Sequence, residues 1–189
     1  MTVVEKLTLV GIAGSLRSAS LNRALLRALQ AALPARIALR IHPLDEVPLY
    51  NQEIDIDPAP IGVAALRQAI AAADGLVLAS PEYNNGMSGV LKNALDWASR
   101  PYAAPCLKSK PTLVMSASPG MAGGVRSHVQ IVTTLLAAGA RLTPGPHVAV
   151  GSARDKFTDG ALTDEPTREF MLAAVNRLAA EIVRLRAAG

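Results

Sequence analysis

The chain alternates short apolar runs with longer stretches in which apolar residues recur every three or four positions. A short, continuous apolar run predicts a strand buried on both faces, whereas the longer period predicts an amphipathic helix. The predicted strands are residues 6–13, 37–41, 75–79, 112–117 and 147–150. The first predicted helix begins at Leu21 and is stopped by Pro34, and the next two span residues 60–73 and 89–100. A fourth is marked by the apolar positions Val125, Val129, Val132 and Leu136. The last spans about 165–188, and its residues expected to face inward are Leu172, Val175, Leu178, Ile182 and Leu185.

Five strands alternating with five helices predict a parallel sheet with helices on both faces. No linker, repeat or low-complexity segment interrupts the 189 residues, so we expect one domain over residues 1–189. The predicted fold is α/β, a flavodoxin-like three-layer sandwich with strand order 2-1-3-4-5. Ligands of such sheets bind at the carboxyl ends of the strands, which makes the loops after strands one, three and four the candidate site.

Composition supports a folded core and excludes several classes of protein. Half of the residues are hydrophobic and 18% are charged, which is unlike a disordered chain. No apolar run reaches the ~20 residues that cross a bilayer, and Glu5 and Lys6 interrupt the stretch that a secretion signal would need. The single cysteine, Cys106, excludes an internal disulfide. We therefore expect a soluble, cytoplasmic protein without a membrane partner.

The net charge of +4 does not indicate nucleic acid. The 19 basic residues are scattered, and one Trp, three Tyr and two Phe would supply a base-stacking surface poorly. A modest positive field suits small anionic ligands equally well.

The loop after the first strand, Gly14–Asn22, combines hydroxyl side chains and one arginine with the start of a helix. Free N–H groups and the positive end of the dipole make a helix start favourable for anions. The hydroxyls of Ser15, Ser18 and Ser20, the amide of Asn22 and the guanidinium of Arg17 would add to it. The simpler alternative is that Ser18 or Ser20 only caps the helix and that Arg17 is solvated. The G-x-G-x-x-G and G-x-x-x-x-G-K-[ST] motifs are absent, which favours a monophosphate.

The other two loops are of a kind that approaches a ligand with backbone groups. Residues 80–88 contain an Asn-Asn-Gly turn, and Tyr83 could cover a planar ligand; an ordinary polar turn explains this loop equally well. Residues 116–126 contain three glycines, which permit close approach of the backbone.

Three stretches resemble the NADPH-dependent FMN reductase family, the flavodoxin-like reductases that include quinone, chromate and azo reductases. They are GSLRSASLN at 14–22, PEYNNGMSGVLKNALDW at 81–97 and SPGMAGGVR at 118–126. Ser88 departs from the proline that many relatives carry. The resemblance implies that the FMN phosphate is held by Ser15, Arg17, Ser20, Leu21 and Asn22. It implies that the flavin ring is lined by Pro81, Glu82, Tyr83, Asn84, Asn85 and Gly86, and bordered on its other edge by Ser116 and Gly120.

The implied reaction transfers hydride from NADPH or NADH through FMN to quinones, flavins, azo compounds or metal oxyanions such as chromate. The flavin carries the chemistry, so no catalytic side chain and no metal ligand is expected. The alternatives are a flavodoxin-type electron carrier without nicotinamide activity and a non-enzymatic phosphate-binding module.

The resemblance also implies a homodimer or homotetramer, with the stretch Asn85–Arg100 as the candidate contact. In the same stretch, Lys92, Asn93, Asp96 and Trp97 are expected to be structural. The three histidines, His42, His128 and His147, are far apart in sequence and lack metal-ligand spacing, and Cys106 is expected to be a bystander thiol.

Overall fold

The computed structural model describes residues 6–188; residues 1–5, on which part of the expectation about a secretion signal rests, lie outside it. Its main sheet has the order β2-β1-β3-β6-β7, and β8 also pairs with β6. These strands are β1 (Leu7–Ala13), β2 (Ile37–His42), β3 (Gly75–Ala79), β6 (Pro111–Ala117), β7 (Arg141–Leu142) and β8 (Val148–Val150). All their pairings are parallel, which confirms the predicted flavodoxin-like order.

The fifth position of the sheet holds two short strands where the sequence predicts one. β7 pairs with Pro111 and Thr112 at the start of β6, and β8 pairs with residues 115–117 at its end. Pro144 and Pro146 lie between the two short strands. Proline donates no N–H to a ladder, so the edge strand is interrupted there.

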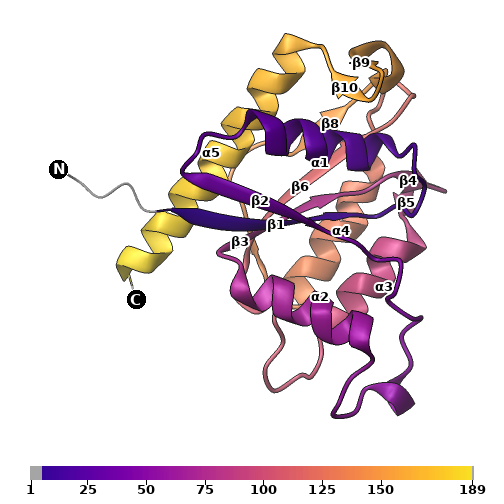
Figure 1. Ribbon diagram of the computed structural model, residues 1–189, viewed down its shortest axis with the longest axis vertical. Helices are drawn as coiled ribbons and strands as arrows, with labels where there is room; N and C mark the ends of the chain where they lie inside the picture. The colour runs from indigo at the N-terminus through magenta and orange to yellow at the C-terminus, as the bar shows by residue number, and fades with distance from the viewer. Residues whose placement is uncertain (1–5, 189) are drawn as a thin grey trace.

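Five helices cover the two faces of the sheet, α1 and α5 on one and α2, α3 and α4 on the other (Figure 1). Their bounds are α1 (Leu21–Ala32), α2 (Ile61–Ala72), α3 (Gly89–Ala98), α4 (Val125–Ala137) and α5 (Glu165–Ala188). Helix α3 ends two residues earlier than predicted, because Arg100 precedes Pro101 and a residue before proline disfavours helical geometry.

The central strands β1, β3 and β6 are buried on both faces, as their continuous apolar sequences predict, whereas the edge strand β2 exposes one face. In β1, Leu7 and Leu9 pack into the core beneath α1 and α5, whereas Val10 and Ile12 pack into the core beneath α2, α3 and α4. Successive side chains point to opposite faces of a strand, so one strand contributes to both cores.

Helix α4 buries a different face from the one that its apolar residues mark. Val125, Val129 and Leu136 are exposed, and the buried positions of the helix are Ser127, His128, Ile131 and Leu135. The helix is turned so that Ser127 and His128 reach hydrogen-bond partners inside the protein. Apolar periodicity alone could not reveal this, because polar groups with buried partners occupy half of the inner face.

The predicted inward face of α5 is largely correct. In α5, Val175, Leu178 and Ile182 are buried, and Leu172 and Leu185 are partly exposed. In α3 the buried residues include Leu91, Ala94, Leu95 and Ala98. The apolar side of the stretch predicted as an oligomer contact is therefore used inside the chain's own core.

Short elements occur in segments without a predicted element. They are the 3-10 helices η1 (Gln52–Ile54) and η2 (Ala153–Lys156) and the two-residue strands β4 (Glu82–Tyr83), β5 (Gly86–Met87), β9 (Phe157–Thr158) and β10 (Ala161–Leu162). β4 pairs with β5, and β9 pairs with β10, each as an antiparallel hairpin.

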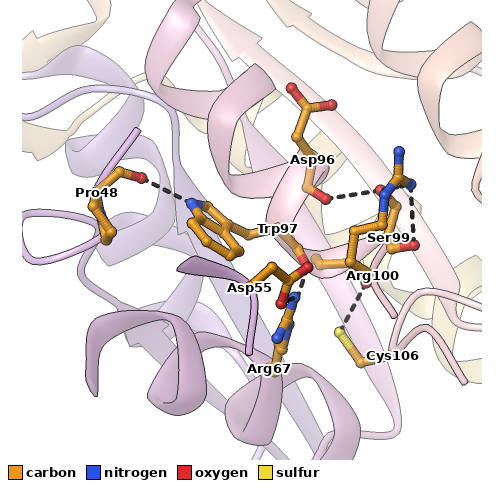
Figure 2. A network of polar contacts seen from close by, with 9 residues as sticks. Pro48, Asp55, Arg67, Asp96, Trp97, Ser99, Arg100 and Cys106 are labelled. Carbon is orange, nitrogen blue, oxygen red and sulfur yellow. Dashed lines mark hydrogen bonds and ion pairs between the residues drawn. The ribbon is translucent and has the colours of Figure 1, made fainter. Parts of the chain in front are cut away.

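The long connection between β2 and α2 is held against α3 by two of the four residues expected to be structural, Asn93 and Trp97. The indole Nε1 of Trp97 donates to the Pro48 carbonyl at 2.8 Å, and Asn93 donates to the same oxygen at 2.8 Å. Arg67 links this connection to α3, through a 2.8 Å ion pair with Asp55 and a 3.1 Å hydrogen bond to the Trp97 carbonyl (Figure 2).

The Cys106 thiol lies at the edge of the same network. Its Sγ donates to the Ala98 carbonyl at 3.2 Å, and burial raises the pKa of the thiol (Figure 2). A raised pKa leaves little reactive thiolate near neutral pH, which agrees with a bystander role.

We expect Trp97→Phe to lower the free energy of unfolding by about 1–3 kcal/mol, through loss of the Pro48 bond and of part of a fully buried ring. Urea unfolding followed by circular dichroism measures the change. The matched control is Tyr102→Phe, since Tyr102 is 79% exposed and should change stability by less than about 0.5 kcal/mol. Equal stabilities of the two variants would contradict the assigned role of the indole.

Candidate functional site

The loops after β1, β3 and β6 meet at one edge of the sheet and enclose a cavity of about 240 Å³, here named the anchor cavity. This volume lies below the ~300–1,000 Å³ of typical ligand sites. The anchor cavity therefore suits the polar end of a larger ligand whose remaining part lies towards solvent. It is lined by Ser15, Arg17, Ala19, Ser20, Leu21, Asn22, Pro81, Glu82, Tyr83, Ala117, Ser118, Pro119 and Arg154.

Eight of the predicted site residues line this cavity: Ser15, Arg17, Ser20, Leu21, Asn22, Pro81, Glu82 and Tyr83. Five do not. Asn84, Asn85 and Gly86 lie at and beyond the turn of the β4–β5 hairpin. Gly120 lies in the loop before α4, and Ser116 is fully buried beneath that loop.

The start of α1 presents several hydrogen-bond donors to the cavity. Ser20 caps the helix, because its Oγ accepts from the Arg23 N–H at 3.2 Å, and the Ser15 Oγ accepts from the Arg17 N–H at 3.4 Å. Both hydroxyls act here as acceptors, so each keeps its own hydrogen to donate to a ligand. Among residues 6–188, no group accepts from the first-turn N–H groups of Leu21 and Asn22. Capping by Ser20 is thus compatible with anion binding at the same place.

The side chain of Asn22 makes two buried hydrogen bonds to the end of β6. Its Nδ2 donates to the Ala117 carbonyl at 3.0 Å, and its Oδ1 accepts from the Ala117 N–H at 2.9 Å. This pair of bonds is buried and fixes the start of α1 to the end of β6. The Asn22 amide therefore holds the two walls of the cavity together, and the backbone N–H of Asn22 stays available to an anion.

Two guanidinium groups line the cavity without an acidic partner. Within the described part of the chain, no carboxylate forms an ion pair with Arg17 or Arg154. The single acid of the lining, Glu82, is paired with Arg126 at 3.3 Å. Unpaired cations beside free N–H and O–H donors form a site that fits a phosphate monoester.

The β4–β5 hairpin forms the opposite wall and is fastened to α4. Glu82 accepts from the Arg126 N–H at the start of α4 at 2.9 Å, and Gln130 accepts from the Met87 N–H at 3.0 Å. Asn84 and Asn85 form the tight turn with φ of 51° and 62°, the left-handed geometry that asparagine tolerates. Tyr83, 52% exposed, stands beside this turn where a planar group could contact it.

Ser88, at the position where many relatives carry proline, has a structural role of its own. Its Oγ accepts from the Leu91 N–H at 3.2 Å, so the residue caps α3 while its backbone N–H reaches the Ser80 hydroxyl at 3.5 Å. A serine here stabilises the junction between hairpin and helix by capping.

Beneath the glycine loop, Ser116 and His128 form a buried pair that supports the loop from inside. The Ser116 Oγ donates to the Gly123 carbonyl at 2.6 Å and lies 2.8 Å from His128 Nε2. A hydroxyl has one hydrogen, so His128 must donate through Nε2. The ring of His147 lies 5.5 Å away, so two histidines that are distant in sequence are neighbours in the fold.

Burial, and secondarily the neighbouring His147, lowers the pKa of His128 to about 4, with Glu82 acting weakly in the opposite direction. The folded protein therefore keeps His128 neutral at pH values where the unfolded chain protonates it. Between pH 6.5 and pH 4 the unfolded state binds more protons, so the free energy of unfolding falls as the pH is lowered.

We expect His128 to account for a loss of about 2 kcal/mol of stability between pH 7.5 and pH 5. His128→Gln keeps a donor for Ser116 and removes the titration, so its stability should decline less over this range. Urea unfolding at both pH values measures the difference. Identical declines in wild type and variant would show that the His128 pKa is not lowered.

Arg154, Ala117, Ser118 and Pro119 line the cavity and were not among the predicted residues. Ser118 and Pro119 belong to the stretch that carries the resemblance and could have been added from it. Arg154 lies in η2 and carries no motif; its side chain joins the site only because β8 delivers η2 to the same sheet edge.

No group of three or more His, Cys, Asp or Glu in residues 6–188 is arranged to hold a metal ion. None of the helices in that range is both long and apolar enough to cross a membrane.

A parallel sheet of this order, with a phosphate-type cavity at the carboxyl ends of its strands, defines a flavodoxin-like α/β protein. The sequence profile of NADPH-dependent FMN reductases matches residues 7–155, and the chain belongs to that family. It is therefore an oxidoreductase that uses FMN and NAD(P)H. The expected fold, enzyme class and cofactors are confirmed.

Individual relatives extend over nearly the whole chain. An NAD(P)H-dependent FMN reductase of Pseudomonas aeruginosa is 36% identical over 183 residues, 96% of this chain and 98% of the relative. A quinone reductase of Pseudomonas putida is 35% identical over 176 residues, 93% and 95% of the two chains. Among solved structures, the flavoenzyme NAD(P)H:(acceptor) oxidoreductase FerB of Paracoccus denitrificans is 31% identical with a TM-score of 0.82, covering 92% of this chain and 98% of FerB.

Proposed function

We propose that this protein reduces quinones and related small acceptors with electrons from NADPH or NADH, through FMN bound with its phosphate in the anchor cavity. One arrangement carries the proposal. Hydrogen-bond donors without acceptors and two arginines without acidic partners line one side of the anchor cavity, and the β4–β5 hairpin forms the opposite wall. The quinone reductases among its relatives support the acceptor class.

The chain's own groups would bind and orient the cofactor. The N–H groups of Leu21 and Asn22, the hydroxyls of Ser15 and Ser20, and the guanidiniums of Arg17 and Arg154 would hold the phosphate. The hairpin around Tyr83 would support the ring, and its attachment to α4 through Glu82 keeps it in place. When bound, FMN supplies the two-electron chemistry that joins nicotinamide oxidation to acceptor reduction.

Steady-state kinetics test the proposal. The purified chain should show flavin absorbance and oxidise NADPH or NADH when p-benzoquinone is added. An electron carrier of the flavodoxin type would carry flavin without oxidising nicotinamide, and a non-enzymatic phosphate-binding module would lack flavin absorbance. Either result would refute the proposed activity. Chromate, an azo dye and free FMN in the same assay would define the acceptor range.

We propose further that the chain is a single domain that works in the cytoplasm as a homodimer or homotetramer. Support for assembly comes from α4, where Val125, Val129 and Leu136 are 46%, 70% and 59% exposed. Apolar side chains that gather on one exposed helix face are typical of protein interfaces.

We expect light scattering to give a mass of two or four chains, and Val129→Glu to shift the mass towards one chain. Arg40→Glu, on the exposed side of β2, is the matched control. A wild-type mass of one chain would contradict the assembly.

A further inference from the structure

A second cavity of about 340 Å³ adjoins the anchor cavity and is named here the side cavity. Ser20, Leu21 and Arg154 line both cavities, so the two share a wall at the start of α1. The side cavity runs along α1 towards the β9–β10 hairpin, which lies above α1 in Figure 1. A ligand held in the anchor cavity could therefore extend into it.

The side cavity opens from one particular end of the anchor cavity. The shared residues belong to the end with the phosphate-type donors, and Pro81 and Tyr83 of the opposite wall do not line the side cavity. An extension that enters the side cavity must therefore start at the phosphate of the ligand and lead away from its ring.

The charge of the side cavity suits a second phosphate. Arg27 and Arg154 line it, and in residues 6–188 no carboxylate forms an ion pair with either. No acidic side chain belongs to its lining. Arg27 lies seven residues, about two turns, beyond the N-cap Ser20 on the same face of α1, so its guanidinium is displaced along the groove from the start of the helix.

The rest of the lining suits a flat, apolar group. Phe157 of β9 lines the groove together with Leu21 and Ala24 of α1, and small residues at Ala24 and Gly160 leave the groove open. An aromatic ring in a groove with aliphatic side chains is a favourable surface for stacking a nucleobase.

We propose that the side cavity binds the adenylate part of FAD, so that this chain accepts FAD as well as FMN. The inference rests on the proposed placement of the flavin phosphate in the anchor cavity. The second phosphate of FAD would contact Arg27 and Arg154, and its adenine would pack against Phe157. The adenylate enters as the tethered end of a flavin, because the side cavity continues from the flavin phosphate.

Flavin fluorescence titrations of the full chain, freed of flavin, test the proposal. Wild type should bind FAD at least as tightly as FMN. Arg27→Gln should weaken FAD binding by about tenfold or more, since charge-assisted phosphate bonds are lost, and change FMN binding by less than about twofold. Arg36→Gln, an exposed arginine that lines neither cavity, is the matched control and should change neither affinity.

Each other outcome decides against the proposal in a distinguishable way. Tight FMN binding with FAD bound far more weakly, or equal effects of Arg27→Gln and Arg36→Gln on FAD, would refute the side cavity and leave the proposed function intact. Absence of binding by either flavin would refute both. A free adenosine monophosphate that binds the FMN-loaded chain through Arg27, with FAD binding unaffected by Arg27→Gln, would assign the cavity to an untethered nucleotide and contradict the proposal.

Discussion

Replacing Arg17 with alanine is expected to weaken FMN binding by about tenfold to a hundredfold, the range of a lost charge-assisted phosphate contact. Arg17 is exposed at the mouth of the anchor cavity, and its guanidinium forms no ion pair with any residue in 6–188. Its removal should therefore leave the fold intact. Fluorescence titration of FMN, with urea unfolding of the flavin-free chain beside it, separates the two effects.

Two further variants define what Arg17 contributes. Arg17→Lys keeps the charge and loses the planar fork that matches a phosphate, so its affinity should fall between those of wild type and Arg17→Ala. Arg40→Ala removes an equal charge from the exposed side of β2 and should leave FMN binding unchanged. If Arg17→Ala and Arg40→Ala bound FMN equally well, Arg17 would not contact the phosphate.

The fold could be predicted from the sequence because its determinants are local and repeated. A strand such as β1 lies between two helical layers, so its apolar run is continuous and easy to distinguish from an amphipathic helix. The β7 strand and the β4–β5 hairpin are two-residue pairings. Their existence depends on partners elsewhere in the chain, and two residues carry no period.

The candidate site shows the same division between local and long-range determinants. The composition of the Gly14–Asn22 loop was enough to predict its role, whereas Arg154 lines the cavity because β8 places the following segment at the same sheet edge. Local sequence does not encode that placement. Asn22 was predicted from its residue type to bind the ligand, but its buried bonds to Ala117, 95 positions away, could not be predicted locally. A residue type can indicate a polar role, but the partner that fulfils it is chosen by tertiary structure.

Gly123 is the glycine of the site loop where we expect substitution to cost most. Its φ is +64°, and a Cβ there would lie 2.8 Å from the Ala149 carbonyl carbon and 2.9 Å from the Gly151 nitrogen. Both are backbone atoms of β8 and its continuation, so no side chain can rotate aside. Left-handed strain and overpacking together should lower the free energy of unfolding of Gly123→Ala by about 3 kcal/mol.

The matched control is Gly160→Ala, because Gly160 has φ +79° and nothing within 4 Å of the added Cβ. It carries the left-handed cost alone, about 1 kcal/mol, so the difference between the two variants measures the clash with β8.

Gly123→Ala should also weaken FMN binding, since moving the Gly123 carbonyl breaks its bond to Ser116 and shifts the loop that includes Ser118 and Pro119. Urea unfolding followed by Trp97 fluorescence, with FMN titration, measures both. If the two variants lost equal free energies of unfolding, the loop around Gly123 would move away from β8 at no cost. The close packing of this loop on β8 would then not determine the shape of this edge of the cavity.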